Sequence, residues 1–234
     1  MSDKHLSSQF DADLNLISSK VLEMGGLVES QIITAMQALN EFDGAAADRV
    51  IAAEDRLNTM EVEIDEECSN IIARRQPAAR DLRLVLAISK TITNLERAGD
   101  EAEKIAKRTK RLMDDGASRG VNIAEIKVSG EMAVSILRRA LDAFARLDTV
   151  AAAQIVRDDK AIDEEFRAFV RKLVSYMMED PRTISVGLDY LFIAKAIERI
   201  GDHAKNIAEF IIYIVKGTDV RHKSRDALER EALS

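Results

Sequence analysis

Residues 95–106 read LERAGDEAEKIA and residues 197–208 read IERIGDHAKNIA, so one segment occurs twice, 102 positions apart. The preceding segments also correspond, because residues 36–55 align with residues 141–160 at an offset of 105. A proline between them recurs at an offset of 104, and short insertions or deletions in loops explain this drift. Three matches in the same order indicate that the chain is an internal duplication.

The composition favours long packed helices. Of the 234 residues, 47% are apolar, only 4% are aromatic and only two are proline, and good helix formers dominate. This composition argues against β-sandwiches, disordered chains and collagen-like repeats. The net charge is −7, and the basic residues are scattered among acidic ones without a visible basic patch. We therefore expect no nucleic-acid partner.

Each half has the hydrophobic periodicity of three helices. In the first half the spacing predicts a helix over residues 8–41, a second that follows the N-cap residue Asp43, and a third from near Pro77 to about Met113. In the second half it predicts helices over residues 122–146, 149–179 and 182–216, with Asp180 and Pro181 at the start of the last. The predicted fold class is all-α, with two tandem three-helix bundles.

Glycines mark the expected boundaries. The linker Asp114–Gly120 separates a first bundle, residues 1–115, from a second bundle, residues 121–217. Gly217 is expected to end the last helix, and the charged tail, residues 218–234, is expected to be loosely held. The pair Gly25-Gly26 interrupts the first helix and predicts a bend there.

The chain has no sequence feature of an exported or membrane-inserted protein. Cys68 is the only cysteine, which excludes an internal disulfide and a multi-thiolate metal site. The start, Met1–Phe10, lacks the apolar core of a signal peptide, and the longest apolar run, Phe210–Val215, is far shorter than a membrane span. We expect a cytoplasmic protein.

The repeated segment carries paired carboxylates. Glu96 and Asp100 lie four residues apart, as do Glu198 and Asp202, so each pair shares one face of a helix. Two adjacent carboxylates repel each other unless a cation lies between them. In the first half Glu103 adds a third acid, whereas Lys205 takes the equivalent place in the second half.

The middle helices carry a similar acidic stripe. Its members are Glu54, Asn58, Glu61 and Asp65 in the first half, with Asp159 and Asp163 in the second. Carboxylates that converge from two helices suit Mg²⁺, Mn²⁺ or Fe. The candidate metal ligands are therefore Glu54, Glu61, Glu96, Asp100, Asp159, Asp163, Glu198 and Asp202.

Other interpretations of these residues stay open. On a helical wheel both acidic pairs fall toward the polar face, where they could be solvated and neutralised by Arg97 and Arg199. His203 is either a ligand or a surface residue, and the Glu-x-x-His pattern of di-iron bundles is missing. The recurring Gly99 and Gly201 indicate close helix packing, a bound ion or a partner. The sequence shows no phosphate loop, Ser/His/Asp set or Cys/His pair that would indicate an enzyme.

At specific strings the chain resembles the PhoU family of phosphate-signalling regulators. These strings cover nearly the whole chain, in order: MEVEIDEEC (60–68), IIARRQPAARDLRLV (71–85), LERAGDEAEKIA (95–106), LDAFARLD (141–148), YMMEDPRTI (176–184) and IERIGDHAKNIAEFIIYIVKG (197–217) with the following RH (221–222).

The resemblance implies two three-helix bundles, often in a homodimer. It also implies two Glu/Asp-x-x-x-Asp motifs per bundle, which carry a metal cluster in some members. Three such motifs are present, but Glu54 is followed by Asn58, which puts equal metal loading of the two bundles in doubt.

For function, the resemblance implies a negative regulator of the phosphate-starvation (Pho) response. Such a protein links the Pst phosphate importer, through its ATPase subunit PstB, to the sensor kinase PhoR. The alternative, motivated by the repeated acidic pairs, is a carboxylate-bridged metal-binding enzyme. A third is a purely structural bundle.

Overall fold

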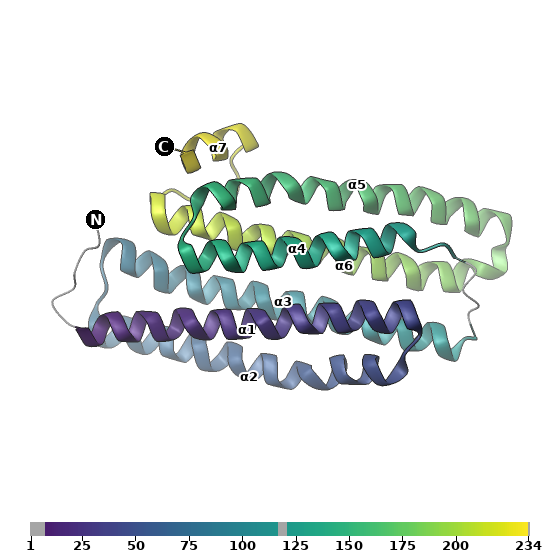
Figure 1. The fold of residues 1–234 in the computed structure, drawn as a ribbon, viewed down its shortest axis with the longest axis horizontal. Coiled ribbons are helices and arrows are strands. Elements are labelled where there is room, and N and C mark those ends of the chain that lie inside the picture. The colour runs from purple at the N-terminus through teal and green to yellow at the C-terminus, as the bar shows by residue number, and fades with distance from the viewer. Residues whose placement is uncertain (1–7, 117–120, 234) are drawn as a thin grey trace.

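The computed structural model describes residues 8–116 and 121–233, and the described part is helical with no strand (Figure 1). The predicted all-α class with an internal repeat is confirmed. Residues 1–7 and the linker residues 117–120 lie outside the described part, as does Ser234. The helices are α1 (Ser8–Glu41), α2 (Gly44–Arg75), α3 (Ala79–Asp114), α4 (Ala124–Arg146), α5 (Thr149–Glu179), the 3₁₀ helix η1 (Pro181–Thr183), α6 (Ile184–Lys216) and α7 (Arg225–Leu233).

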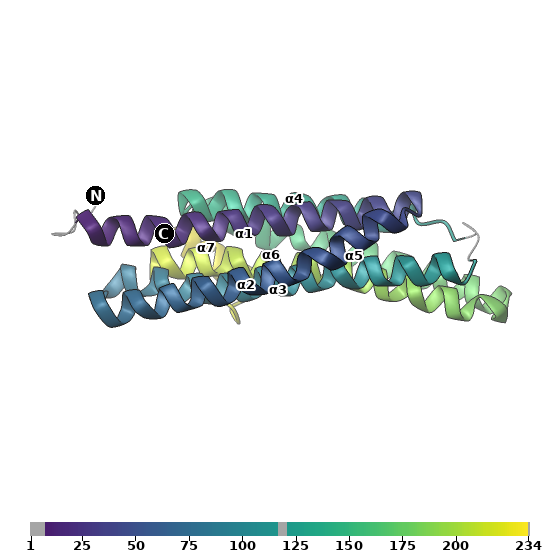
Figure 2. The ribbon, with the colours of Figure 1, turned by 90° about the horizontal axis from the view of Figure 1, so that it is seen from below.

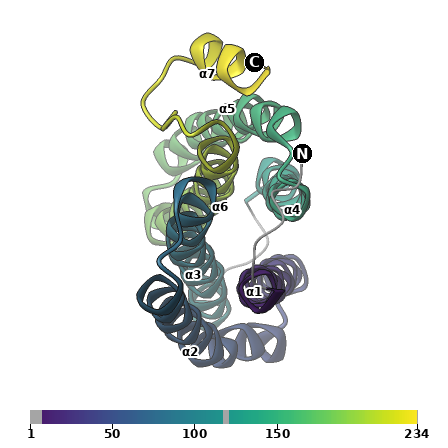
Figure 3. The same cartoon turned by 90° about the vertical axis from the view of Figure 1, so that its left-hand side faces the viewer.

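Helices α1–α3 form one triplet and α4–α6 form another, and the two triplets lie side by side along their length (Figures 1 and 2). The most extensive contact in the molecule joins α3 to α6, so the third helices of the two triplets pack against each other. Helix α1 also contacts α4, on one side of the α3–α6 pair (Figure 3). The division into folding units 1–115 and 121–217 stays a prediction.

The helix ends follow the expected capping chemistry. The Asp43 carboxylate accepts hydrogen bonds from the backbone N–H groups of Ala45 and Ala46, at 2.9 and 3.0 Å. Gly217 ends α6 in the left-handed region, with φ of 77°, as predicted. The expected start of the last helix is slightly wrong, because Pro181 opens the separate turn η1 and α6 begins at Ile184.

The prediction of a loosely held tail is wrong. Residues 225–233 form α7, which packs against α5, and Leu228 and Ala232 are each only 2% exposed. The Thr149 hydroxyl donates a hydrogen bond to the Ala232 carbonyl oxygen at 2.9 Å. The high charge of the segment hides an amphipathic spacing, because two apolar residues four apart are enough to attach one short helix.

Gly25 and Gly26 do not interrupt α1, which runs continuously from Ser8 to Glu41. Gly25 is buried, and a Cβ atom there would lie 2.4 Å from Cδ2 of Leu141 on α4. A Cβ atom at Gly26 would meet nothing within 4 Å. Gly25 therefore permits the close approach of the two triplets at the α1–α4 contact.

Adjacent substitutions should consequently have opposite effects. Gly26→Ala should stabilise the protein by up to about 1 kcal/mol, because alanine is the better helix former. Gly25→Ala should destabilise it by about 1–2 kcal/mol, because the buried Leu141 side chain must move. Urea unfolding of the two variants measures both changes. Equal shifts of the same sign would contradict the assignment of Gly25 to the α1–α4 contact.

The core is aliphatic and continues through both triplets. Cys68, on α2, lies in this core with 2% of its surface exposed, and burial raises the pKa of its thiol to about 12. No helix in the described part of the chain combines the length and apolar character needed to cross a bilayer.

Candidate metal centre

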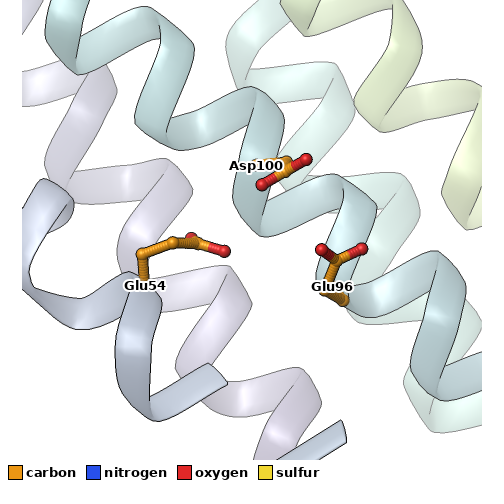
Figure 4. Close-up of side chains that lie close together, drawn as sticks. All are labelled: Glu54, Glu96 and Asp100. Atoms are coloured by element: carbon orange, nitrogen blue, oxygen red, sulfur yellow. The ribbon is translucent and has the colours of Figure 1, made fainter. Parts of the chain in front are cut away.

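Three predicted ligands meet in the first triplet. Glu54 extends from α2 toward Glu96 and Asp100 on α3, and one carboxylate oxygen of each lies within 4.8 Å of the others (Figure 4). Glu96 and Asp100 lie on one face of α3 because they are one turn apart. The arrangement brings three carboxylate groups from two helices close together.

Burial makes this cluster electrostatically unfavourable without a cation. Both carboxylate oxygens of Glu54 are out of contact with solvent and have no hydrogen-bond partner. Burial, and then the negative charges of Asp100, Glu103 and Glu96, raise the pKa of Glu54 to about 7. The pKa of Glu96 is also raised, by burial first and then by Asp100. Orphaned buried carboxylate oxygens are the donor set that fits a hard divalent cation.

Glu61 is not part of this group of three. Its Oε1 accepts a hydrogen bond from the Thr93 hydroxyl at 2.9 Å, two turns along α2 from Glu54. Asp65, one turn further, accepts a hydrogen bond from the Ser89 hydroxyl at 2.5 Å. These two acids therefore join α2 to α3 through neutral donors.

The second triplet fills the equivalent place with a lysine. The Lys205 ammonium lies 3.1 Å from Oδ2 of Asp159 and 3.4 Å from Oδ1 of Asp202. Asp159 is only 2% exposed, and burial raises its pKa while the positive charge of Lys205 lowers it. Glu198 forms an ion pair with Lys195. The residues of this half do not fit a metal ion as they stand, because Lys205 already neutralises the buried carboxylate.

Two other residues that the sequence analysis singled out have definite positions. Asp163 is partly buried, and its negative charge contributes to the raised pKa of Asp159. His203 contacts the third helix of the other triplet, because its Nδ1 lies 3.1 Å from Oδ1 of Asn94 on α3. Asn206 donates to the same oxygen at 3.0 Å, so His203 belongs to a polar network between α3 and α6.

The repeated glycines have a packing role. A Cβ atom at Gly99 would lie 2.1 Å from Cδ2 of Leu57, and one at Gly201 would lie 2.9 Å from Cδ1 of Ile162. Both glycines therefore let the middle helix of each triplet approach the third helix closely. The second glycine also admits the Asp159 carboxylate, whose Oδ1 would lie 3.1 Å from that Cβ.

Sequence reasoning noted Lys205 only as a departure from the acidic pattern and missed its function as a counterion. The signal was present, because Lys205 aligns with Glu103 and follows Asp202 by three residues. What the sequence did not show is that Lys205 also reaches Asp159, on a different helix.

The family model for the PhoU domain matches the chain twice, over residues 21–109 and 126–211. The chain belongs to the PhoU family. The two matches correspond to the two helix triplets, so this PhoU-family chain contains the domain in duplicate.

Relatives of the chain share most of its length. A Burkholderia protein named phosphate-specific transport system accessory protein PhoU homolog is 63% identical over all of both chains. The Escherichia coli K12 protein named phosphate-specific transport system accessory protein PhoU is 47% identical over 97% of this chain and 94% of its own length.

Solved structures agree on the fold. The crystal structure of PhoU from Pseudomonas aeruginosa matches with a TM-score of 0.86 and 46% identity, over 89% of this chain and 100% of that one. The phosphate transport system regulatory protein PhoU from Streptococcus pneumoniae matches with a TM-score of 0.84 and 28% identity, over 90% of this chain and 99% of that one.

The raised pKa of Glu54 predicts how stability changes with pH in the chelated PhoU-family chain. The unfolded state loses this proton near pH 4.5, whereas the folded state holds it to about pH 7, so stability falls as pH rises between these values. Because the cluster is partly solvated, we expect a loss of about 1–2 kcal/mol. Glu54→Gln should remove that loss, measured by urea unfolding at pH 5 and pH 8.

The variant must be compared with the parent chain, because the titration of His203 changes stability with pH in the opposite direction to that of Glu54. Burial, and then the positive charge of Arg97, lower the pKa of His203 to about 4, so its contribution is lost as pH falls from about 6.5 toward 4. Glu209, whose pKa burial raises to about 7, changes in the same direction as Glu54. Both contributions cancel in the difference, and an unchanged pH dependence in the variant would contradict the prediction.

Proposed function

We propose that this chain is a non-enzymatic cytoplasmic regulator of phosphate uptake and signalling. The observation that carries the proposal is the match of the PhoU domain to both halves, together with full-length relatives named as accessory proteins of phosphate transport. In this role the protein represses the phosphate-starvation response when phosphate is plentiful. It does so by coupling the Pst importer, through PstB, to the sensor kinase PhoR, as a homodimer.

A packed helical body suits this role. Such a body changes a partner's activity only by binding one of the partner's conformations more tightly than another. The α3–α6 contact joins the two triplets, so surfaces on both halves keep a fixed separation. An adaptor that contacts two partners needs this geometry.

The proposal is tested in the organism that carries the gene. Deletion should raise the output of a phosphate-starvation reporter in high phosphate, and a plasmid copy should restore repression. Co-purification should recover PstB and PhoR, with recovery that differs between cells grown in high and low phosphate. Unchanged reporter output in the deletion strain would refute the regulatory role.

We further propose that the first triplet binds a divalent or iron-type metal ion, such as Mg²⁺, Mn²⁺ or Fe, through Glu54, Glu96 and Asp100. The supporting observation is the pair of buried, unpartnered oxygens of Glu54. A bound cation would neutralise the cluster and cross-link α2 to α3. In the second triplet Lys205 supplies that charge, so we propose unequal loading of the two halves.

Glu54→Gln separates metal binding from stability. The variant should bind Mn²⁺ at least about tenfold more weakly, because it loses a charged ligand. In chelator at pH 8 it should nevertheless be more stable than the parent chain, because a buried negative charge is removed. Calorimetric titration and urea unfolding measure the two quantities. Asp142→Asn, on the exposed face of α4, is the matched control and should change neither.

The cluster also motivates the alternative of a carboxylate-bridged metal-binding enzyme. A screen of the Mn²⁺- and Fe-loaded protein for phosphatase and oxidase activity distinguishes this enzyme from the proposed regulator. Turnover that Asp100→Asn abolishes would favour the enzyme, whereas inactive loaded protein combined with a derepressed deletion strain favours the regulator.

A further inference from the structure

Helices α3 and α6 pack against each other (Figure 3), and together they carry a line of cations. On α3 these are Arg97, Lys104, Arg108 and Arg111, which with Glu101 follow spacings of four and three and so share one helix face. Arg199 of α6 joins them. We call these five cations the cationic seam. Acidic residues separate Arg97 from Lys104 in the sequence, but residues 104–111 read KIAKRTKR and contain no acid, so the sequence-based expectation of no basic patch is not met on this face.

Two buried carboxylates hold four of the five cations of the seam in place, because each carboxylate contacts two cations. Glu101, about 5% exposed, pairs with Lys104 at 3.0 Å and with Arg199 at 3.2 Å. Asp189 of α6, about 2% exposed, pairs with Arg108 at 2.7 Å and lies 3.9 Å from Arg111. Two positive charges lie at Glu101 and two at Asp189, so one positive charge remains in excess at each carboxylate. The excess is notable in a chain of net charge −7.

The positive charges remain accessible. The side chains of Lys104, Arg199 and Arg111 are 50%, 53% and 60% exposed. Side chains that a carboxylate already holds in place lose little conformational entropy when they bind an anionic group. Their exposed surface leaves room for that group to approach. This arrangement differs from a solvated face, where each long side chain must be ordered by the ligand.

An apolar stripe continues the seam along α6. Ile184, Leu188 and Phe192 are each separated by one turn and are 46%, 42% and 49% exposed. The Arg108 guanidinium lies 4.4 Å from the centre of the Phe192 ring, which joins the stripe to the cations. Aromatic and arginine side chains together are typical of the residues that dominate binding energy at protein interfaces.

We propose that the cationic seam with its apolar stripe is a docking surface for an acidic amphipathic helix of a partner protein. Charge complementarity supports this occupant. The two charge-excess positions on α3, at Glu101 and Arg108, are seven residues apart, which is two turns or about 10.5 Å. A partner helix with acidic residues seven apart presents its charges at the same interval. Its apolar residues in the next turn would reach Phe192 and Leu188.

The shape of the surface favours a helix over a flat or extended polyanion. The cations follow one helix face and its neighbour in a single line that continues into the apolar stripe of α6, which matches the charged and apolar residues of one amphipathic helix. Duplex DNA is bound largely through its phosphate charges, and these do not require the apolar stripe. The proposal is separate from the regulatory role and from the metal centre, since it uses neither a named partner nor the carboxylate cluster.

The test uses the full chain and a fluorescent helical peptide of 21 residues. The peptide carries two Glu residues seven positions apart and Leu residues in the following turn, and a second version has Gln in place of Glu. Fluorescence anisotropy should show at least about tenfold tighter binding of the Glu peptide, with affinity that falls as salt rises. Equal binding of the two peptides would overturn the proposal.

Variants locate the peptide on the surface. The double variant Arg111→Gln/Arg199→Gln removes one cation from each pair and leaves Asp189 with Arg108 and Glu101 with Lys104. We expect its affinity to fall about tenfold, and that of Phe192→Ala to fall similarly. The matched control Lys127→Gln/Arg146→Gln loses two exposed charges on α4 and should bind as the parent chain does. Circular dichroism verifies that each variant is folded.

Three further outcomes would contradict the inference. The first is an equal loss of affinity in the seam variant and the α4 control. The second is binding of anionic lipid vesicles or of duplex DNA as tight as that of the Glu peptide and equally sensitive to Arg111→Gln/Arg199→Gln. The third is a change of oligomeric state in the seam variant, measured by light scattering, which would assign the surface to a second copy of the chain.

Discussion

Lys205→Glu is expected to give the second triplet a metal site and to raise the metal bound at saturation about twofold. The substitution places a carboxylate where Glu103 stands in the first triplet and removes the ammonium that now lies between Asp159 and Asp202. The second half would then present Asp159 and Asp202 without Lys205 between them, and Glu198 would still pair with Lys195. Calorimetric titration with Mn²⁺ and metal analysis after gel filtration measure the stoichiometry.

The same variant should become dependent on metal for its stability. Without metal, removal of Lys205 leaves the buried Asp159 without its partner, at a cost of about 2–3 kcal/mol. Added Mn²⁺ should recover most of this loss, because an ion that binds only the folded state stabilises it. Lys127→Glu makes the same charge change on α4 and should alter neither quantity. A Lys205→Glu protein that is destabilised but binds no additional Mn²⁺ would show that the lysine is not what excludes the ion.

Arg108→Ala is expected to cause a large loss of stability, about 3 kcal/mol. Asp189 is 2% exposed and its Oδ2 has no hydrogen-bond partner, so its charge depends on Arg108, with Arg111 further away at 3.9 Å. Removal of one member of a buried pair leaves an uncompensated charge. For a chain of this length the loss corresponds to roughly 6–12 °C in the unfolding temperature.

The reverse substitution should be milder. Asp189→Ala leaves Arg108 30% exposed and able to turn toward solvent, so we expect a cost of about 1 kcal/mol. The double variant Arg108→Ala/Asp189→Ala should therefore be more stable than Arg108→Ala alone. Urea unfolding of the three variants closes a double-mutant cycle. Additive losses would show that the two residues are not coupled.

Much of the fold could be predicted because it depends on local periodicity. The duplicated segment and the caps at Asp43 and Gly217 placed the six long helices within a few residues of their observed ends. The errors arose where tertiary contacts override local signals. Gly25 interrupts no helix because its missing side chain accommodates Leu141, and α7 is attached by Leu228 and Ala232 despite its charge.

The candidate site could be predicted only in part for a similar reason. Spacing along one helix identifies pairs such as Glu96 and Asp100, but it does not determine which residues of the next helix face them. The structure brings Glu54 to this pair and gives Glu61 to Thr93 instead. The cationic seam was missed for the same reason, since the acid that contacts Arg108 and Arg111 is Asp189, on the distant helix α6.

Labelling of the buried Cys68 thiol can measure local opening of the protein. A thiol with a pKa of about 12 and almost no solvent contact reacts with a maleimide only after α2 separates from its neighbours. Since this is the only cysteine, the labelling rate reports on the first triplet alone. Measured beside the global unfolding rate, it reveals whether the duplicated halves of the molecule open together or one at a time.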